Sequence, residues 1–299
     1  MSNIICELLG IRYPIILGGM ARVGTAPLAA AVSQAGGLGL LGGGPLNGAE
    51  LKAWIEHVRE LTENPFGVNI PVNSEHAEEL VETVIAERVK AVATSAGNPR
   101  RFTSRLKEQG IFVMHVVPTS AYAVTAEEAG VDAVVAEGVE SGGMTSLEEV
   151  STFVLVPQVV DAVKCPVIAA GGIGDGRGLA AALALGADGV QMGTAFMATE
   201  ECEISRAFKE LMIRARETDT RLLRRERSSR RIFKEEFYER VLNNQPHLQA
   251  DLQADMGASV RGAGQVSGLI REIRPVKAVI EQMVSEAREI LSSVSEKFS

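Results

Sequence analysis

Short apolar runs alternate with longer amphipathic segments along the first two thirds of the chain. The longer segments, such as 50–62 and 176–186, carry apolar residues three and four positions apart, which predicts helices. The short runs predict buried strands, and strands that alternate with helices indicate a parallel sheet covered by helices. There are eight such runs, at 13–20, 38–43, 65–72, 89–97, 111–118, 132–138, 165–172 and 188–196.

Eight strand–helix units close naturally into a ring, so the pattern predicts an α/β fold, a (β/α)8 TIM barrel, over residues 1–200. An open doubly wound sheet is the alternative, but the regular count of eight favours the barrel. From about residue 200 the pattern changes to charged, helical segments at 200–245 and an amphipathic helix at 269–299. We therefore predict additional C-terminal helices, a helical extension at 201–299 that packs on the barrel. A small separate helical domain is the alternative.

Composition narrows the function classes. The chain has 299 residues, 46% of them hydrophobic, which is enough for one large core. A net charge of −8 and only 4% aromatic residues disfavour nucleic acid as a partner. Cys6, Cys165 and Cys202 form no CxxC pair, so we expect reduced thiols rather than disulfides or a metal site. No signal peptide or membrane span is recognised, and a cytoplasmic protein without a membrane partner is the expectation.

Two glycine-rich loops follow the last two predicted strands. AAGGIGDGRG at 169–178 lets backbone N–H groups approach a ligand, and the helix after it offers a positive N-terminal end. QMGTAF at 191–196 adds a backbone donor at Gly193 and a hydroxyl at Thr194. Phosphate sites of TIM barrels recur at these two positions, so we predict phosphate binding rather than two bare turns.

Several motifs occur in an order that resembles a known family. The chain resembles the flavin-dependent enoyl-acyl carrier protein reductases and the related nitronate monooxygenases over essentially its whole length. The most specific motif is PVIAAGGIGDGRGLAAALALGADGVQMGT at 166–194, whereas the region 200–260 matches loosely. The other motifs are GGMARV at 18–23, AGGLGLLGGG at 35–44, PFGVNI at 65–70, TSAGNP at 94–99, AEGVESGG at 136–143 and AGQVSGL at 263–269.

The resemblance implies FMN as the cofactor, with NADH or NADPH as a possible reductant, and the sequence offers no metal site. Residues 262–268 would return to the active face. Asn69 and Gln191 would meet the flavin's pyrimidine edge, where an amide can both donate and accept hydrogen bonds. The phosphate would meet Gly171, Gly172, Gly193 and Thr194, and the flavin ring would lie along Gly18, Gly19 and Met20, with Glu137 as a further cofactor contact.

One position departs from the family's pattern. The relatives carry a catalytic histidine after the double glycine that follows strand six, and here that position is Met144. A thioether cannot perform the acid–base work of an imidazole, so the proton-transfer step lacks its usual group. His115, in the fifth predicted strand, is the first candidate substitute, although a lone histidine in an apolar strand is more often an ordinary core residue.

The only strong charge cluster is the arginine-rich stretch at 221–231. It could receive phosphates of a carrier-protein pantetheine arm, of coenzyme A or of a nicotinamide dinucleotide. The simpler interpretation, which we favour, is a solvated helical face balanced by nearby glutamates.

Three functions remain open on the sequence alone. The first is an FMN-dependent oxidoreductase that reduces or oxidises a small-molecule or acyl-thioester substrate, with acyl carrier protein or coenzyme A as possible partners. The second is a flavin-binding protein that has lost catalysis and acts as a sensor, carrier or complex subunit. The third is a phosphate-binding isomerase or aldolase, which lacks a suitably placed lysine. A homo-oligomer, for example a dimer, is expected for the first.

Overall fold

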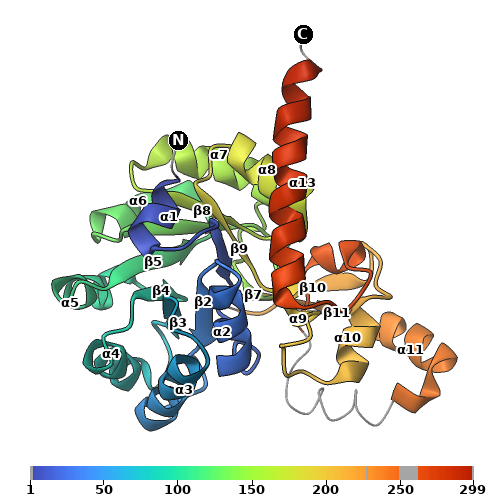
Figure 1. Cartoon of the computed structure of the whole chain (residues 1–299), viewed down its shortest axis with the longest axis horizontal. Helices are drawn as coiled ribbons and strands as arrows, with labels where there is room; N and C mark the ends of the chain where they lie inside the picture. Colours follow the sequence, from blue (N-terminus) through green and yellow to red (C-terminus); the bar gives the residue numbers. More distant parts are fainter. Residues whose placement is uncertain (1–2, 227, 249–261, 298–299) are drawn as a thin grey trace.

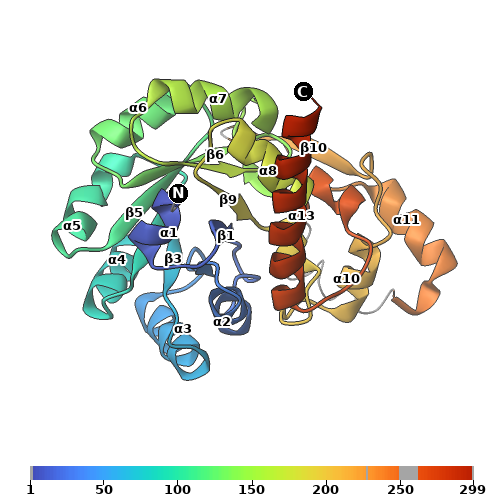
Figure 2. The same ribbon diagram turned by 45° about the horizontal axis from the view of Figure 1, so that its top comes forward.

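A computed structural model describes residues 3–226, 228–248 and 262–297. Eight parallel strands form one sheet in the order β1-β9-β8-β6-β5-β4-β3-β2. A parallel bridge between Ile16 and Leu38 joins the two end strands, so the sheet closes into the predicted (β/α)8 barrel (Figures 1 and 2). The barrel strands are β1 (Ile15–Leu17), β2 (Gly39–Gly42), β3 (Phe66–Pro71), β4 (Ala91–Ser95), β5 (Phe112–Val117), β6 (Ala133–Glu137), β8 (Val167–Ala170) and β9 (Gly189–Met192).

Helices cover the outside of the ring. The long helix α13 (Val276–Glu296) packs against α8 and α2, and it buries Val276, Ile280, Met283 and Ala287 at helical spacing. The final segment of the chain thus covers the barrel between the last and the first strand–helix units (Figure 1). The other covering helices are α2 (Ala26–Gln34), α3 (Gly48–Leu61), α4 (Ala77–Ala86), α5 (Thr103–Glu108), α6 (Ser120–Glu128), α7 (Thr152–Ala162) and α8 (Gly176–Ala184), with α1 (Ile4–Leu9) before the first strand.

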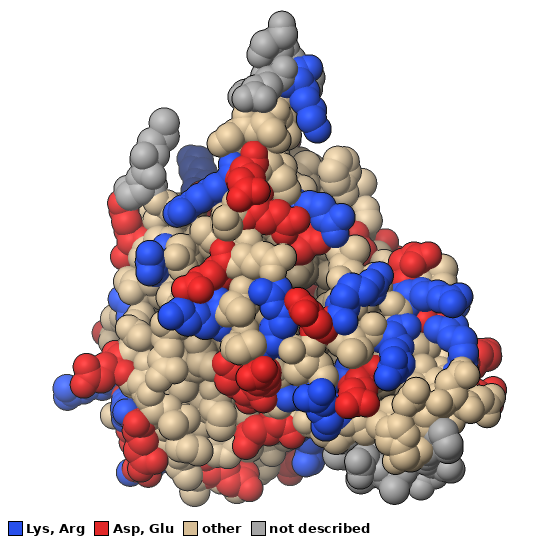
Figure 3. Space-filling model, turned by 45° about the vertical axis from the view of Figure 1, so that its right-hand side comes forward, with Lys and Arg blue, Asp and Glu red and all other residues tan. Residues whose placement is uncertain are grey.

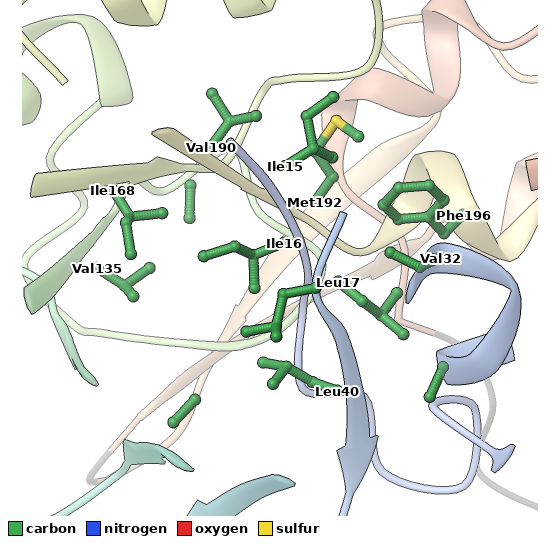
Figure 4. Packing of buried hydrophobic residues seen from close by; sticks show 14 of the residues in the cluster. Ile15, Ile16, Leu17, Val32, Leu40, Val135, Ile168, Val190, Met192 and Phe196 are labelled. Carbon is green, nitrogen blue, oxygen red and sulfur yellow. The ribbon is translucent and has the colours of Figure 1, made fainter. Parts of the chain in front are cut away.

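The strand register divides the barrel residues into an inner and an outer set. Successive side chains of a strand point to opposite faces, and paired residues of neighbouring parallel strands point to the same face. Glu137 pairs with Ala170, and Ala170 pairs with Gln191, so these three share one face. Ile16, Val135 and Ile168 belong to the same face and lie inside the ring of strands (Figure 4). The middle of the barrel interior is therefore apolar, whereas the interior at the carboxyl-terminal ends of the strands, the mouth of the barrel, carries polar side chains.

The extension after the barrel contains a sheet that the sequence did not suggest. β10 (Thr220–Arg224) and β11 (Ser229–Phe233) pair antiparallel, and β11 also pairs with β7 (Gly143–Thr145) from the loop after β6. The helical character predicted for 200–245 is wrong at 220–233, because pairing with β7 outweighs the high helix propensity of Arg, Leu and Glu.

Helices do flank this sheet. They are α10 (Arg206–Met212) and α11 (Glu235–Asn244), with α9 (Thr194–Met197) directly after β9. A 3-10 helix, η3 (Gln265–Leu269), precedes α13, and another, η2 (Pro246–Leu248), follows α11. A third, η1 (Pro99–Arg101), precedes α5. Within the described ranges, no helix combines the length and the apolar character that crossing a membrane needs.

Candidate functional site

Three polar side chains line the inner face at the mouth of the barrel. Asn69 lies in the second half of β3, Glu137 is the last residue of β6, and Gln191 lies near the end of β9. Asn69 is 7% exposed, and its Nδ2 donates to the carbonyl of Ala93 at 3.0 Å. Gln191 is 8% exposed, and its Oε1 is buried with no hydrogen-bond partner among the described residues. A buried amide oxygen without a donor is costly, which indicates a site built for a ligand.

The loop after β1, the strand next to β9, contacts residues of both β9 and β3. The N–H of Gly18 donates to the carbonyl of Met192 at 2.7 Å. A Cβ placed on Gly19 would lie 2.2 Å from Cγ of Asn69, and one on Gly193 would lie 3.1 Å from Sδ of Met20. The glycines therefore let the backbone approach closely, and the structure brings Gly18, Gly19, Met20, Asn69 and Gly193 together.

The two predicted phosphate loops lie beside the loop after β6. Gly171 and Gly172 both adopt left-handed φ values, +95° and +71°. A Cβ on Gly171 would lie 2.9 Å from the carbonyl oxygen of Gly138. Gly193 caps the short helix α9 without a side-chain cap, and the hydroxyl of Thr194 accepts the N–H of Gly264 at 3.0 Å. The segment 262–268 thus contacts the loop that follows the last barrel strand.

The start of α8 is less available than the sequence suggested. The side chain of Asp175 accepts the N–H groups of Arg177 and Gly178, and Glu286 from α13 accepts the N–H of Gly176 at 2.8 Å. Two carboxylates therefore already satisfy this helix end. The groups left for a phosphate are the backbones at Gly171–Gly172 and Gly193–Thr194.

Glu137 has an unusual environment for a carboxyl group. Its Oε1 accepts a hydrogen bond from the hydroxyl of Ser141 at 3.0 Å. Burial raises the pKa of Glu137 to about 7, and the hydrogen bond from Ser141 opposes that rise. No Lys, Arg or His of the described residues lies within ion-pair distance of it. Glu137 can therefore exchange a proton near neutral pH.

Glu140, three residues later, has a different role. Both of its carboxylate oxygens accept the N–H of Thr152, at 3.0 and 2.9 Å, and Oε2 also accepts the Thr152 hydroxyl at 2.9 Å. These bonds hold the loop after β6 to the start of α7. Glu140 is thus a structural anchor of the loop that contains Ser141.

The two candidates for the family's histidine lie in different places. Met144 is in β7, 63% exposed and paired across the sheet with Arg230. His115 pairs with Thr94, on the face of the sheet opposite to Asn69, and Thr94 Oγ1 lies 2.7 Å from its Nδ1. Burial lowers the pKa of His115 to about 4. The structure therefore does not bring His115 to the polar row of the mouth.

The arginine-rich stretch belongs to the β10–β11 hairpin rather than to a helical face. Arg224 pairs with Glu149 at 2.6 Å and Arg221 with Glu235 at 3.7 Å. Basic and acidic side chains intermingle on this side of the molecule (Figure 3). Arg231 is buried, and its Nε donates to the carbonyl of Val139 at 2.9 Å, which ties the hairpin to the loop after β6. No pattern in the sequence indicates this link.

The arrangement fits a flavin better than a metal ion. The amides at the mouth can donate and accept along a heterocycle edge, and the glycine backbones leave room for a flat ring and a phosphate. No cluster of three or more potential metal ligands occurs in the part of the chain that the structure describes.

Comparisons with known proteins identify the family of the chain. The family model "Nitronate monooxygenase" matches residues 2–82 and 72–286. A probable nitronate monooxygenase from Staphylococcus aureus is 38% identical over 263 residues, 73% of this chain and 74% of that protein. FabK from Thermotoga maritima is 41% identical, with a TM-score of 0.90 and 99% of both chains covered. A nitroalkane oxidase from Streptomyces ansochromogenes is 29% identical, with a TM-score of 0.83, covering 97% of this chain and 99% of that one.

Proposed function

The chain belongs to the nitronate monooxygenase family and is a flavin-dependent oxidoreductase of that superfamily, and from this premise we propose that it binds FMN at the barrel mouth and reduces an enoyl thioester. The observation that carries the FMN site is the buried Oε1 of Gln191, which has no hydrogen-bond partner among the described residues, beside Gly19 and Gly171, where a Cβ would lie within 3 Å of a neighbouring atom. The similarity to FabK over 99% of both chains favours an enoyl thioester as the substrate class.

The proposed FMN site assigns each part of the mouth a role. The backbones of Gly171, Gly172 and Gly193 and the end of α9 at Thr194 hold the phosphate. Gly18, Gly19 and Met20 lie along the ring, and Asn69 and Gln191 contact its pyrimidine edge. Bound flavin supplies hydride transfer, and the protein supplies binding, orientation and proton exchange. NADH or NADPH is the proposed reductant, and the thioester is linked to acyl carrier protein or coenzyme A.

A second candidate reaction is oxidation of a nitronate, favoured by the nitroalkane oxidase among the structural neighbours and by the curated relatives. The relatives with activities in their names are enzymes, so nothing supports a flavin carrier without catalysis.

The experiment begins with the purified protein, its absorbance spectrum and mass spectrometry of the heat-released cofactor. FMN at one equivalent is expected, and FAD, or no flavin after reconstitution, would contradict the site. The FMN-loaded protein is then mixed anaerobically with NADH or NADPH, and turnover is measured with crotonyl-coenzyme A and with propyl-1-nitronate. Bleaching by a nicotinamide together with reduction of crotonyl-coenzyme A supports the proposal. Turnover of the nitronate alone supports the second reaction.

A further inference from the structure

Glu137 and Gln191 face one another across a single small residue. Both pair in register with Ala170, one from each side, so the three form one row on the inner face. Neighbouring strands lie about 4.8 Å apart, which places the two Cα atoms roughly 10 Å apart. The side chain of Ala170 is too short to fill that space. The row therefore sets a carboxyl group opposite a buried amide oxygen that has no donor in the part of the chain that the structure describes.

The surroundings leave the carboxyl group free to exchange its proton. Ser141 is the hydrogen-bond donor that the structure gives it, and no cationic side chain within the described ranges forms an ion pair with it. The other candidate acid–base groups already have hydrogen-bond partners within the chain. Glu140 caps α7, Asp175 caps α8, and His115 lies on the outer face with Thr94. Met144 has no exchangeable proton.

We propose that Glu137 is the catalytic residue of this barrel that exchanges a proton with the substrate, on the same row as Gln191, the proposed flavin contact. This inference rests on the proposed flavin site. In reduction of an enoyl thioester, bound flavin would supply a hydride to one alkene carbon. The carbon next to the thioester carbonyl takes the proton of Glu137. The O–H bond breaks, its electron pair stays on the carboxylate, a C–H bond forms, and water returns the proton.

The first test replaces Glu137 with its uncharged isostere. FMN-loaded Glu137→Gln should keep one equivalent of flavin and should lose about a hundred- to ten-thousand-fold in turnover of crotonyl-coenzyme A, the usual contribution of general acid catalysis. Glu148→Gln, an exposed carboxyl of the same loop, is the matched control and should behave as wild type. Glu137→Asp should recover part of the activity. Turnover of Glu137→Gln within threefold of wild type would overturn the proposal.

The second test does not depend on turnover. Infrared spectroscopy of the apo and FMN-loaded protein should show a protonated carboxylic acid band that disappears with a midpoint near pH 7. The band should be absent in Glu137→Gln and present in Glu148→Gln. Because the Ser141 hydroxyl favours the ionised form, Ser141→Ala should move the midpoint to higher pH. A band that persists in Glu137→Gln, or an unchanged midpoint in Ser141→Ala, would refute the assignment. Absence of flavin from wild type would instead refute the proposed function.

Discussion

The inner and outer faces of the barrel sheet treat buried polar groups in opposite ways. On the outer face, the ring of His115 and the hydroxyl of Thr94 contact each other, and the same hydroxyl donates to the carbonyl of Met114 at 3.2 Å. On the inner face, Gln191 Oε1 has no donor among the described residues, and Glu137 receives one hydrogen bond. His115 and Thr94 are thus satisfied by the chain itself, whereas the amide oxygen of Gln191 at the mouth lacks a donor among the described residues and is free for a ligand.

The same contrast holds for charge. Burial disfavours the charged form of any group, so it lowers the pKa of His115 and raises that of Glu137. Both groups are therefore neutral over much of the range between pH 4.5 and 6.5. The consequences for stability have opposite signs, which separates the two faces experimentally.

The largest predicted effect is a pair of opposing stability slopes. The pKa of Glu137 rises from 4.5 to about 7 on folding. The contribution of this group to the free energy of unfolding is therefore complete below pH 4.5 and is lost as pH rises through 7. The pKa of His115 falls from 6.5 to about 4, so its contribution is present above pH 6.5 and is lost as pH falls toward 4. Across its own pH window, each group changes the free energy of unfolding by about 3 kcal/mol.

Replacing one of the two groups should therefore reveal how the other changes the free energy of unfolding with pH. Urea unfolding of the apo-protein at pH 5.0, 5.75 and 6.5 should show stability that rises with pH in Glu137→Gln and falls with pH in His115→Asn. The wild type should be nearly flat in this window. Parallel curves for the three proteins would contradict the difference between the two faces.

The next largest effect concerns the close approach of the loop after β1. Gly19→Val would force its Cβ against Asn69, where a Cβ would lie 2.2 Å from Cγ. We expect FMN affinity to fall at least a hundredfold, about 2.7 kcal/mol. Fluorescence titration of apo-protein with FMN measures this. Gly130→Ala, in the turn between α6 and β6, is the control for backbone strain: its φ of +87° should cost stability, while its FMN affinity should stay unchanged.

A smaller effect is expected at Gln191. Removing the unpartnered amide with Gln191→Met should stabilise the apo-protein by about 1 kcal/mol, because a buried unsatisfied group disappears while side-chain volume is kept. FMN affinity should decrease in the same variant. Thermal unfolding with and without FMN separates the two changes. A variant less stable than wild type without FMN would mean that Gln191 is satisfied within the chain.

The smallest effect is expected at Met144. Because this side chain is 63% exposed, Met144→His should change stability by no more than about 0.5 kcal/mol. Its turnover with crotonyl-coenzyme A should rise less than about tenfold if Glu137 already supplies the proton. A hundredfold rise would indicate that the wild-type site lacks a proton donor.

The sequence by itself determined the barrel and the approximate composition of its mouth. Apolar runs that alternate with amphipathic helices specify a parallel sheet, because the period of the pattern fixes which residues can be buried. Glycines at the strand ends predict the loops where backbone approaches a ligand. The role of each site residue in FMN binding stays a prediction, which the experiments above address.

Only the tertiary structure decided the rest, because it depends on residues far apart in the chain. Pairing of β11 with β7 turned an arginine-rich segment of high helix propensity into a strand. The strand register placed His115 on the outer face and set Glu137 opposite Gln191, a relation between residues 54 positions apart that no local pattern contains. Burial then gave Glu137 and His115 their pKa shifts, since desolvation depends on the assembled surroundings of a group rather than on its neighbours in sequence.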